Sequence, residues 1–256
     1  MWNPKQYNKF NDYRTRPAID LINAIPNLNY DCIVDLGCGS GHITQMLYER
    51  FAPQQLTGID SSESMLNIAK TDFTQINWQL NDISNLSNNY DLVFSTSALQ
   101  WLSHHEQLFT NLIKHTNKVM AIQMPNNFRF PAHALLHETI QENTHFKTKL
   151  HKVINGKPLI REDPVFPINK YYDILHHLVS RLDIWETTYL QQLTGENPVL
   201  EWVKGTALLP VETNLSTDEF DEFKIIYNKK LLQAYPKNSN GVTLFPFNRI
   251  FIVATK

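Results

Sequence analysis

The sequence predicts an α/β fold, a doubly wound and mostly parallel seven-stranded sheet. Short apolar, β-branched runs, typical of strands buried on both faces, alternate with segments of helical spacing. Strands that alternate with helices in this way are joined by crossovers and run parallel, with helices on both faces of the sheet. The seven expected strands are 31–36, 55–59, 76–80, 90–95, 118–123, 183–190 and 244–254.

Helices are expected between the strands, and the rhythm changes in the second half of the chain. Ser61 and Ser62 are N-cap candidates for a helix that runs through Lys70. After Met124, five prolines punctuate a polar stretch without a clear strand, which we interpret as a helical cap insertion. The last two strands are expected to pair as an antiparallel edge. The other expected helices are 42–51, 106–115, 170–179, 197–206 and 217–234.

The chain is expected to form a single domain over residues 1–256. The cap would consist of residues 1–25 and about 125–169, together with helices within about 196–235. A chain of 256 residues is long enough for one large α/β core.

Composition excludes several kinds of partner. The 23 basic and 25 acidic residues leave a formal net charge of -2, so no global field attracts nucleic acid or an anionic membrane. No apolar stretch approaches the roughly eighteen residues of a membrane helix, and the amino terminus lacks an apolar signal core. We therefore expect a cytoplasmic protein that binds neither nucleic acid nor membrane, and a monomer, although a larger assembly is left open.

The cysteines and histidines do not predict a metal site. Cys32 and Cys38 are the only cysteines, and their spacing matches neither a zinc site nor a redox pair. The pairs His104–His105 and His176–His177 lack the i, i+4 spacing and the carboxylate neighbours of a metal site. We therefore expect no bound metal.

A glycine loop follows the first expected strand. The segment Asp35–Gly41 (DLGCGSG) lies where a buried strand turns into a helix, and glycines there allow the backbone to approach a ligand. Dinucleotide-binding enzymes use the spacing G-x-G-x-x-G, whereas this loop has G-x-G-x-G with an acidic residue two positions before the first glycine. A ligand without phosphates fits this loop better.

Acidic residues follow the next two strands as well. Asp60, at the end of the second strand, has a carboxylate that can accept both hydroxyl protons of a ribose. After the third strand, Asp82 can accept from an adenine amino group, and Ile83 can pack on the ring. Together with Asp35, these residues suit an adenosyl sulfonium with a free amino group. The alternative is that they are solvated turn residues.

These residues resemble the class I S-adenosylmethionine-dependent methyltransferases, and the flanking segments resemble one family, the trans-aconitate 2-methyltransferases. The resemblance covers nearly the whole chain. The segments that carry it are Trp2–Phe10 (WNPKQYNKF), Arg14–Ala18 (RTRPA), Val34–Thr44 (VDLGCGSGHIT), Thr57–Leu66 (TGIDSSESML), Ser97–Leu102 (SALQWL), Ala121–Asn127 (AIQMPNN), Tyr171–Leu175 (YYDIL), Asp183–Tyr189 (DIWETTY), Trp202–Thr206 (WVKGT) and Phe245–Ala254.

The resemblance implies a Rossmann-like fold and transfer of a methyl group from S-adenosylmethionine to a carboxylate of a small tricarboxylic acid. The products would be a monomethyl ester and S-adenosylhomocysteine. A carboxylate is already anionic at neutral pH, so no general base is needed and in-line positioning can supply much of the rate. We therefore predict no catalytic residue, and expect donors such as arginine to hold the acid.

The predicted site residues form two groups. Those expected to bind the cofactor are Asp35, Gly37, Cys38, Gly39, Gly41, Asp60, Ser61, Asn81, Asp82, Ile83, Ser97, Gln100 and Trp101. Those expected to bind the acid are Trp2, Tyr7, Arg14, Arg16, Tyr171, Tyr172, Lys204 and Arg249. The alternative for the basic residues is a solvated surface or a structural ion pair, and for the aromatic residues it is core packing.

Three positions depart from the family pattern. Leu209 stands before a proline where an arginine is usual, which removes one cation and favours a smaller or less charged acid. Asn126 replaces an aspartate, and Asn248 stands where a proline usually precedes the final arginine. None of the three lies in the cofactor motif.

Other functions remain open at this stage. The acceptor could be another small acid or an acid on a carrier protein. The chain could bind S-adenosylmethionine without turnover. A nicotinamide-dependent oxidoreductase would use the same glycine turn and Asp60, but the G-x-G-x-G spacing and Asp82 argue against it. Methylation of nucleic acid is not expected, because the sequence has no basic stripe.

Overall fold

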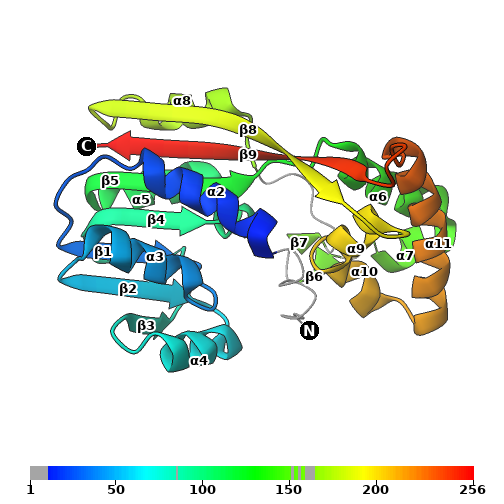
Figure 1. Ribbon diagram of the computed structural model, residues 1–256, viewed down its shortest axis with the longest axis horizontal. Helices are drawn as coiled ribbons and strands as arrows, with labels where there is room; N and C mark the ends of the chain where they lie inside the picture. Colours follow the sequence, from blue (N-terminus) through cyan, green and yellow to red (C-terminus); the bar gives the residue numbers. More distant parts are fainter. Residues whose placement is uncertain (1–10, 85, 151–152, 155–156, 159–164) are drawn as a thin grey trace. The chain divides into compact units, whose positions relative to one another are not determined.

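The computed structural model describes residues 11–84, 86–150, 153–154, 157–158 and 165–256. Seven strands form one sheet in the order β3-β2-β1-β4-β5-β9-β8 (Figure 1). All seven predicted strands are confirmed. Their bounds are β1 (Cys32–Leu36), β2 (Gln55–Asp60), β3 (Asn77–Leu80), β4 (Tyr90–Thr96), β5 (Thr116–Pro125), β8 (Arg181–Leu193) and β9 (Thr243–Thr255).

The sheet is mostly parallel, with its last strand antiparallel, as predicted. Strands β1 to β5 pair in parallel, and β9 pairs antiparallel with β5, so that Arg249 stands opposite Pro125. In Figure 1, β8 points in the same direction as β5. Because β9 runs against its neighbours, the start of its pairing with β5 lies at the edge where the parallel strands end. This edge, the carboxyl edge of the sheet, receives Arg249.

Burial explains why the central strands read as continuous apolar runs. Every residue of β4 except its last is buried, and β1 buries four of its five residues. Strands covered on both faces gain from apolar side chains at every position. By contrast, β8 is an edge strand whose first half is largely exposed, and Trp185 there stacks on Phe251 of β9 with ring centroids 4.8 Å apart. The alternating pattern predicted for this strand reflects its position at the edge.

Helices connect and cover the strands. Ser62 caps α4, as predicted, by accepting from the backbone N–H of Met65 at 3.4 Å. In Figure 1, α2 and α3 lie in front of the sheet and α5 lies behind it. The helices are α2 (Asn11–Ala24), α3 (His42–Phe51), α4 (Glu63–Asp72), the 3₁₀ turn η1 (Leu99–Trp101), α5 (His105–Lys114), α6 (Pro131–Glu142), α7 (Thr144–Leu150), α8 (Ile168–Leu175), α9 (Pro198–Lys204), α10 (Leu209–Asn214) and α11 (Thr217–Ala234).

One expectation about the second half of the chain is wrong. The proline-punctuated stretch was expected to lack strands, yet β6 (Val153–Ile154) and β7 (Lys157–Pro158) pair as a two-stranded antiparallel sheet. Each strand has only two residues, which is too short for an alternating pattern to identify.

The chain divides into two compact units. The sheet unit comprises Thr15–Pro125, Pro164–Thr187 and Arg249–Lys256. The helical unit comprises the described residues of Met1–Arg14, Asn126–Asp163 and Thr188–Asn248. The proposed cap segments therefore divide between the units, with residues 15–25 in the sheet unit. The single domain with a cap stays a prediction.

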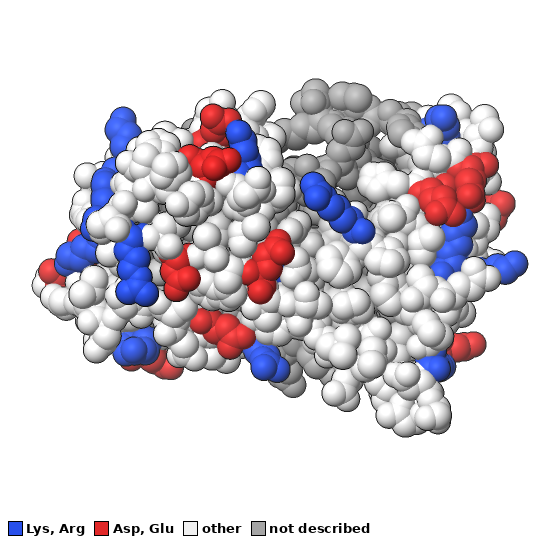
Figure 2. All heavy atoms as spheres, turned by 90° about the horizontal axis from the view of Figure 1, so that it is seen from above, with Lys and Arg blue, Asp and Glu red and all other residues white. Residues whose placement is uncertain are grey.

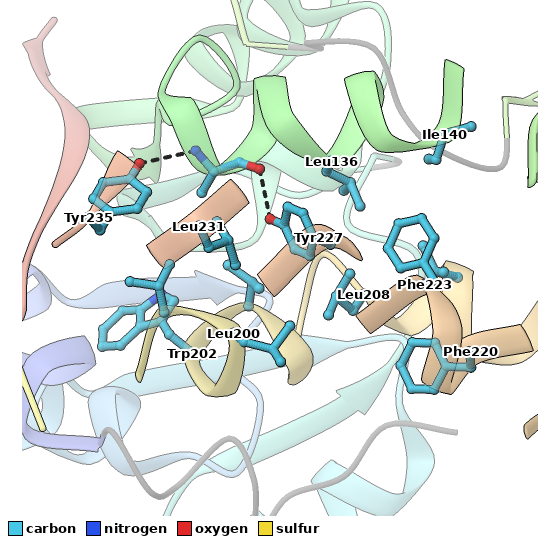
Figure 3. Close-up of a cluster of buried hydrophobic side chains, with 14 of the residues drawn as sticks. Leu136, Ile140, Leu200, Trp202, Leu208, Phe220, Phe223, Tyr227, Leu231 and Tyr235 are labelled. Carbon is cyan, nitrogen blue, oxygen red and sulfur yellow. Dashed lines mark hydrogen bonds between the residues drawn. The ribbon is translucent and has the colours of Figure 1, made fainter. Parts of the chain in front are cut away.

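The helical unit has its own aromatic core. Phe146, Trp202, Phe223 and Phe245 are among its buried side chains. The helices α6, α7, α9, α10 and α11 contribute to this core, as do the unit's parts of β8 and β9. Figure 3 shows this cluster beneath α6. Burial of large aromatic side chains dominates the stability of such a core.

Two tyrosines of this core hold the start of α6. The hydroxyl of Tyr227 donates to the carbonyl of Ala132 at 2.7 Å, and the hydroxyl of Tyr235 accepts from the N–H of Ala132 at 3.0 Å (Figure 3). Ala132 is the second residue of α6, so its N–H has no acceptor within the helix. Tyr235 supplies the partner that a capping side chain at Phe130 does not provide.

Surface charge is mixed. On the face drawn in Figure 2, lysines and arginines are interspersed with aspartates and glutamates, and neither sign forms a continuous patch among the described residues. Within the same described ranges, no helix is long and apolar enough to cross a membrane.

Tyr235→Phe is expected to destabilise the protein more than Tyr227→Phe. The first substitution leaves the buried N–H of Ala132 without an acceptor, which costs about 1–3 kcal/mol. The second removes the hydroxyl that donates to the carbonyl of Ala132. This carbonyl stays within α6, so the loss should cost about 1 kcal/mol. Urea unfolding measures both, and Tyr172→Phe, at an exposed tyrosine, serves as the control. Equal losses in the two core variants would contradict this role of Tyr235.

Candidate functional site

The loops that follow the first four strands meet at the carboxyl edge of the sheet. Leu36 stands opposite Ile59, and Asp60 stands opposite Leu80, so the loops after β1, β2 and β3 begin at nearly the same level. The N–H groups of Gly37 and Cys38 both donate to the carbonyl of Ile59, at 2.8 and 3.1 Å. The sheet register thus brings the predicted cofactor residues of these loops to one edge.

The glycine loop adopts a left-handed backbone at each of its three glycines. Gly37, Gly39 and Gly41 have φ values of +76°, +55° and +86°. A Cβ on Gly37 would lie 2.2 Å from Cβ of Ala98, and one on Gly41 would lie 2.7 Å from the ring of Trp78. These two positions must therefore be glycine because of packing within the protein, whether or not a ligand also approaches the backbone there.

Gly39 differs from its two neighbours. Among the described residues, the only atom within 4 Å of the Cβ position of Gly39 is the terminal methyl of Met65, at 3.3 Å. This is the flexible end of a side chain. Among the three glycines, Gly39 is the one at which a ligand has room to approach the backbone.

Asp60 holds the loop and the next helix together. Its Oδ2 accepts from the N–H of Gly39 at 2.8 Å, and its Oδ1 accepts from the N–H of Ser62 at 2.8 Å. A carboxylate has about four acceptor positions, so each oxygen keeps capacity for a ligand hydroxyl. The half-buried carboxylate of Asp60 at a strand end is therefore compatible with a ribose, and the exposed Ser61 lies beside it.

Asp35 lies behind the glycine loop and is only 1% exposed. Its Oδ2 accepts from the hydroxyl of Thr44 in the first turn of α3 at 2.6 Å, while its Oδ1 has no hydrogen-bond partner among the described residues. Burial and the nearby charge of Asp60 raise the pKa of Asp35 to about 7, although the Thr44 hydrogen bond opposes this shift. The ionised form of Asp35 therefore lacks full compensation, and a nearby cation would favour it.

Cys38, in the same loop, remains a thiol. Burial, reinforced by Asp35 and Asp60, raises the pKa of this cysteine above its usual value. A protonated and buried thiol is a weak nucleophile, so Cys38 contributes to packing in the loop and not to covalent chemistry.

The loop after β3 presents two exposed polar side chains and one half-buried apolar one. Asp82 accepts from the N–H and the hydroxyl of Ser84 at 2.9 and 2.8 Å, and Asn81 accepts from the N–H of Asp82 at 2.9 Å. Cδ1 of Ile83 lies 3.8 Å from the Cβ position of Gly37. Ile83 therefore lies beside the glycine loop, as an adenine-packing residue would require.

The turn after β4 contains the remaining predicted cofactor residues. Ser97 has a left-handed backbone with φ +56°, and the amide of the buried Gln100 donates to the carbonyl of Ser97 at 2.6 Å. Trp101 is 45% exposed. Because Ala98 packs against Gly37, this turn and the glycine loop fix each other's position.

Arg249 reaches the same turn from β9. Its side chain is buried, and Nη1 donates to the hydroxyl of Ser97 at 2.7 Å. The oxygen Oε1 of Gln123, in β5, accepts from Thr96 at 2.7 Å and from Ser97 at 3.3 Å. These bonds place a guanidinium at the carboxyl edge, next to the turn that packs on the glycine loop.

The structure does not test whether four other predicted acid-binding residues lie near Arg249. Trp2, Tyr7 and the side chain of Arg14 lie outside the described residues. Arg16 is exposed on α2. Lys204, in the last turn of α9, belongs to the helical unit. These residues stay predictions.

The two tyrosines of α8 differ sharply. Tyr171 is fully buried, with its hydroxyl 2.6 Å from Nδ1 of His105 and 3.1 Å from the backbone N of Phe166. Tyr172 is 49% exposed and stacks on His176 with ring centroids 5.0 Å apart. The position of Tyr171 is consistent with core packing. It does not support the predicted contact between Tyr171 and an acid.

Several residues of the site escaped the sequence analysis. Thr44, Ala98, His105 and Gln123 are all buried, and each is bonded to or packed against a predicted residue or its turn. Gln123 was identifiable as the one amide in an otherwise apolar stretch of strand. Ala98 and Thr44 carry no such signal, because their importance depends on which loops meet.

Comparison with known proteins indicates a methyltransferase, the class that the sequence resembles. A family model described as a methyltransferase domain matches residues 33–118. The YcgJ protein of Bacillus subtilis superposes with a TM-score of 0.59 at 13% identity, over 94% of this chain and 98% of that one. Phosphoethanolamine N-methyltransferase 2 of Haemonchus contortus superposes with a TM-score of 0.54 at 15% identity, over 94% of this chain and 52% of that one. At these identities the superpositions show a shared fold.

Sequence relatives are more specific. The chain is 35% identical to the trans-aconitate 2-methyltransferase of Shigella flexneri over 100% of this chain and 98% of that protein. The enzyme of the same name from Escherichia coli K12 matches at the same identity and coverage. With its seven-stranded sheet and glycine loop, the chain is a class I methyltransferase that uses S-adenosylmethionine. More specifically, it belongs to the trans-aconitate 2-methyltransferase family.

Gly37→Ala is expected to weaken binding of S-adenosylhomocysteine at least tenfold. The new Cβ would displace Ala98 and with it the turn after β4. Gly195→Ala is the matched control: Gly195 also has a positive φ, +117°, but none of the described residues lies within 4 Å of its Cβ position. This control should keep ligand affinity despite a backbone penalty of about 1–2 kcal/mol. Calorimetric titration distinguishes the two, and equal affinities in the two variants would contradict the packing role of Gly37.

Proposed function

We propose that this methyltransferase esterifies one carboxylate of trans-aconitate, or of a closely similar small polycarboxylic acid, to give a monomethyl ester. The observation that supports an anionic acceptor is the buried guanidinium of Arg249 at the carboxyl edge, bonded to Ser97 in the turn that packs on the glycine loop. The names of the full-length relatives support the particular acid.

The described residues fit S-adenosylmethionine. Asp60 would accept from the ribose hydroxyls, while Asp82 and Ile83 would contact the adenine. The backbone at Gly39 would admit the amino acid part, since the glycine loop leaves room there. The ionised carboxylate of Asp35, whose Oδ1 has no hydrogen-bond partner among the described residues, would favour a cation nearby. The predicted contacts of Ser61, Asn81, Gln100 and Trp101 are part of the same proposal.

Arg249 would hold the acid by its charge. A guanidinium can donate two parallel hydrogen bonds to one carboxylate, which fixes both its distance and its plane. Ser97, in the turn after β4, accepts from this guanidinium and donates to Gln123 of β5, which fixes the position of the serine hydroxyl. The acid can thus be held beside the donor site by groups that belong to the sheet unit.

The reaction requires little else from the protein. When bound, S-adenosylmethionine supplies a methyl group on a sulfonium, an electrophile for an anionic oxygen. An aconitate carboxylate is ionised at neutral pH, so no side chain has to remove a proton. The residues described here therefore act by positioning, which can account for several kcal/mol of the barrier.

Leu209 bears on which acid fits. It is the first residue of α10, and the family pattern that the chain resembles implies an arginine at this position. An acid with three carboxylates has one potential cationic partner fewer there, and we infer that this protein holds its acid with fewer charged contacts than a relative that has the arginine.

Methyl transfer into trans-aconitate, cis-aconitate, isocitrate and citrate tests the proposal. We expect selective turnover of trans-aconitate. Arg249→Lys should raise the KM for the acid about tenfold or more, because a lysine cannot reproduce the bidentate contact and a charged hydrogen bond contributes about 1.5–3 kcal/mol.

The matched control is Arg181→Lys, at an exposed arginine that begins β8. It should leave the KM for the acid and the KM for S-adenosylmethionine unchanged. Binding of S-adenosylmethionine without turnover of any of the four acids would refute the proposed acceptor while leaving the enzyme class intact.

A further inference from the structure

A directional chain of hydrogen bonds runs through the interior of the sheet unit to the turn after β4. His105, the first residue of α5, is 1% exposed. Its Nε2 lies 3.0 Å from the carbonyl oxygen of Leu99, and its Nδ1 lies 2.6 Å from the hydroxyl of Tyr171. That hydroxyl also accepts from the N–H of Phe166 at 3.1 Å.

These contacts determine where the protons are. A carbonyl oxygen only accepts, so Nε2 of His105 carries a hydrogen, and in the neutral imidazole Nδ1 is then the acceptor. The hydroxyl of Tyr171 therefore donates to Nδ1. The chain runs from the N–H of Phe166 through Tyr171 and His105 to the carbonyl of Leu99, and each group has one defined role in it.

The end of this chain is the 3₁₀ turn η1, which begins at Leu99. The turn closes on itself through Trp101 N–H to Ala98 carbonyl at 3.1 Å and Leu102 N–H to Leu99 carbonyl at 3.0 Å. The two residues that precede it meet the rest of the site: Ala98 packs on Gly37, and Ser97 accepts from Arg249.

Aromatic rings hold the imidazole in place around its edge. Phe109, Phe166 and Tyr171 have ring centroids 5.7, 5.8 and 5.9 Å from that of His105. With the ring fixed in this way, a shift of the imidazole requires a shift of α5 or of the start of α8. The Leu99 carbonyl is thereby anchored to two helices.

We propose that His105, oriented by Tyr171, is a positioning residue for methyl transfer: its Nε2–H fixes the turn 97–102, which places Ala98 on the glycine loop and Ser97 on Arg249. The expected effect on turnover rests on the proposed function, methyl transfer to an acid held by Arg249. The anchoring of the turn by His105 does not depend on that function. His105 touches neither donor nor acid in this proposal and exchanges no proton with them.

Two substitutions separate the donor end of the imidazole from its acceptor end. In His105→Gln, the side-chain amide NH₂ can take the place of Nε2–H and still donate to Leu99. In His105→Asn, the shorter amide can take the place of Nδ1 toward Tyr171 but does not reach Leu99. Tyr171→Phe is nearly isosteric and removes the hydroxyl that donates to Nδ1. It still tests the proposal if either His105 variant fails to fold.

Amide hydrogen exchange in the full-length protein gives a readout that does not depend on activity. We expect exchange of residues 97–102 to be at least tenfold faster in His105→Asn than in wild type, and within about threefold of wild type in His105→Gln. Tyr171→Phe should accelerate exchange in the same segment. Amides of α3 report general loosening of the sheet unit and should change little in all three variants.

Turnover at saturating acid and S-adenosylmethionine gives the functional readout. We expect kcat to fall at least tenfold in His105→Asn and to be largely restored in His105→Gln. Equal exchange in segment 97–102, or equal kcat, in the two His105 variants would overturn the proposal, as would unchanged exchange of that segment in Tyr171→Phe. If wild type turns over no acid, the proposed function fails, while the exchange comparison still decides the role of His105.

Discussion

The geometry of the donor site depends on the hydrogen bonds that the carboxylate of Asp60 accepts. Its two oxygens accept N–H groups from the glycine loop and from the start of α4, and its backbone carbonyl accepts from Asn81 at 3.1 Å. One residue thus connects the loops that follow β1, β2 and β3. Together with the Ile59 carbonyl, which accepts from Gly37 and Cys38, Asp60 holds the left-handed glycine backbone in place, and the same carboxylate is the one proposed for the ribose.

The turn after β4 extends this organisation from the donor side to the acid side. Ala98 occupies the space that a side chain on Gly37 would need, and Ser97 accepts from the buried guanidinium of Arg249. A displacement of the turn would therefore disturb both the glycine loop and the proposed acid-binding group. This coupling suits a reaction whose rate depends on the alignment of two ligands and not on acid–base chemistry.

The sequence predicted the seven strands and their parallel arrangement because buried strands are continuous apolar runs, and it identified the glycine loop and Asp60 by their positions after those strands. It did not reveal why Gly37 must be glycine, since the clash with Ala98 joins residues sixty-one positions apart in the chain (98 − 37 = 61). It also left Tyr171 between an acid contact and core packing, and only the structure shows that its hydroxyl is buried against His105. Both outcomes depend on tertiary contacts that no local pattern contains.

The most direct test of the central claim, that the carboxyl edge of the sheet binds the methyl donor through Asp60, is calorimetric titration of Asp60→Asn with S-adenosylhomocysteine. Loss of the charged acceptor should weaken binding by about 1.5–3 kcal/mol. Asp72→Asn, at the exposed end of α4, should bind as wild type does. Unchanged affinity in a folded Asp60→Asn protein would contradict the assignment of the donor site to this edge.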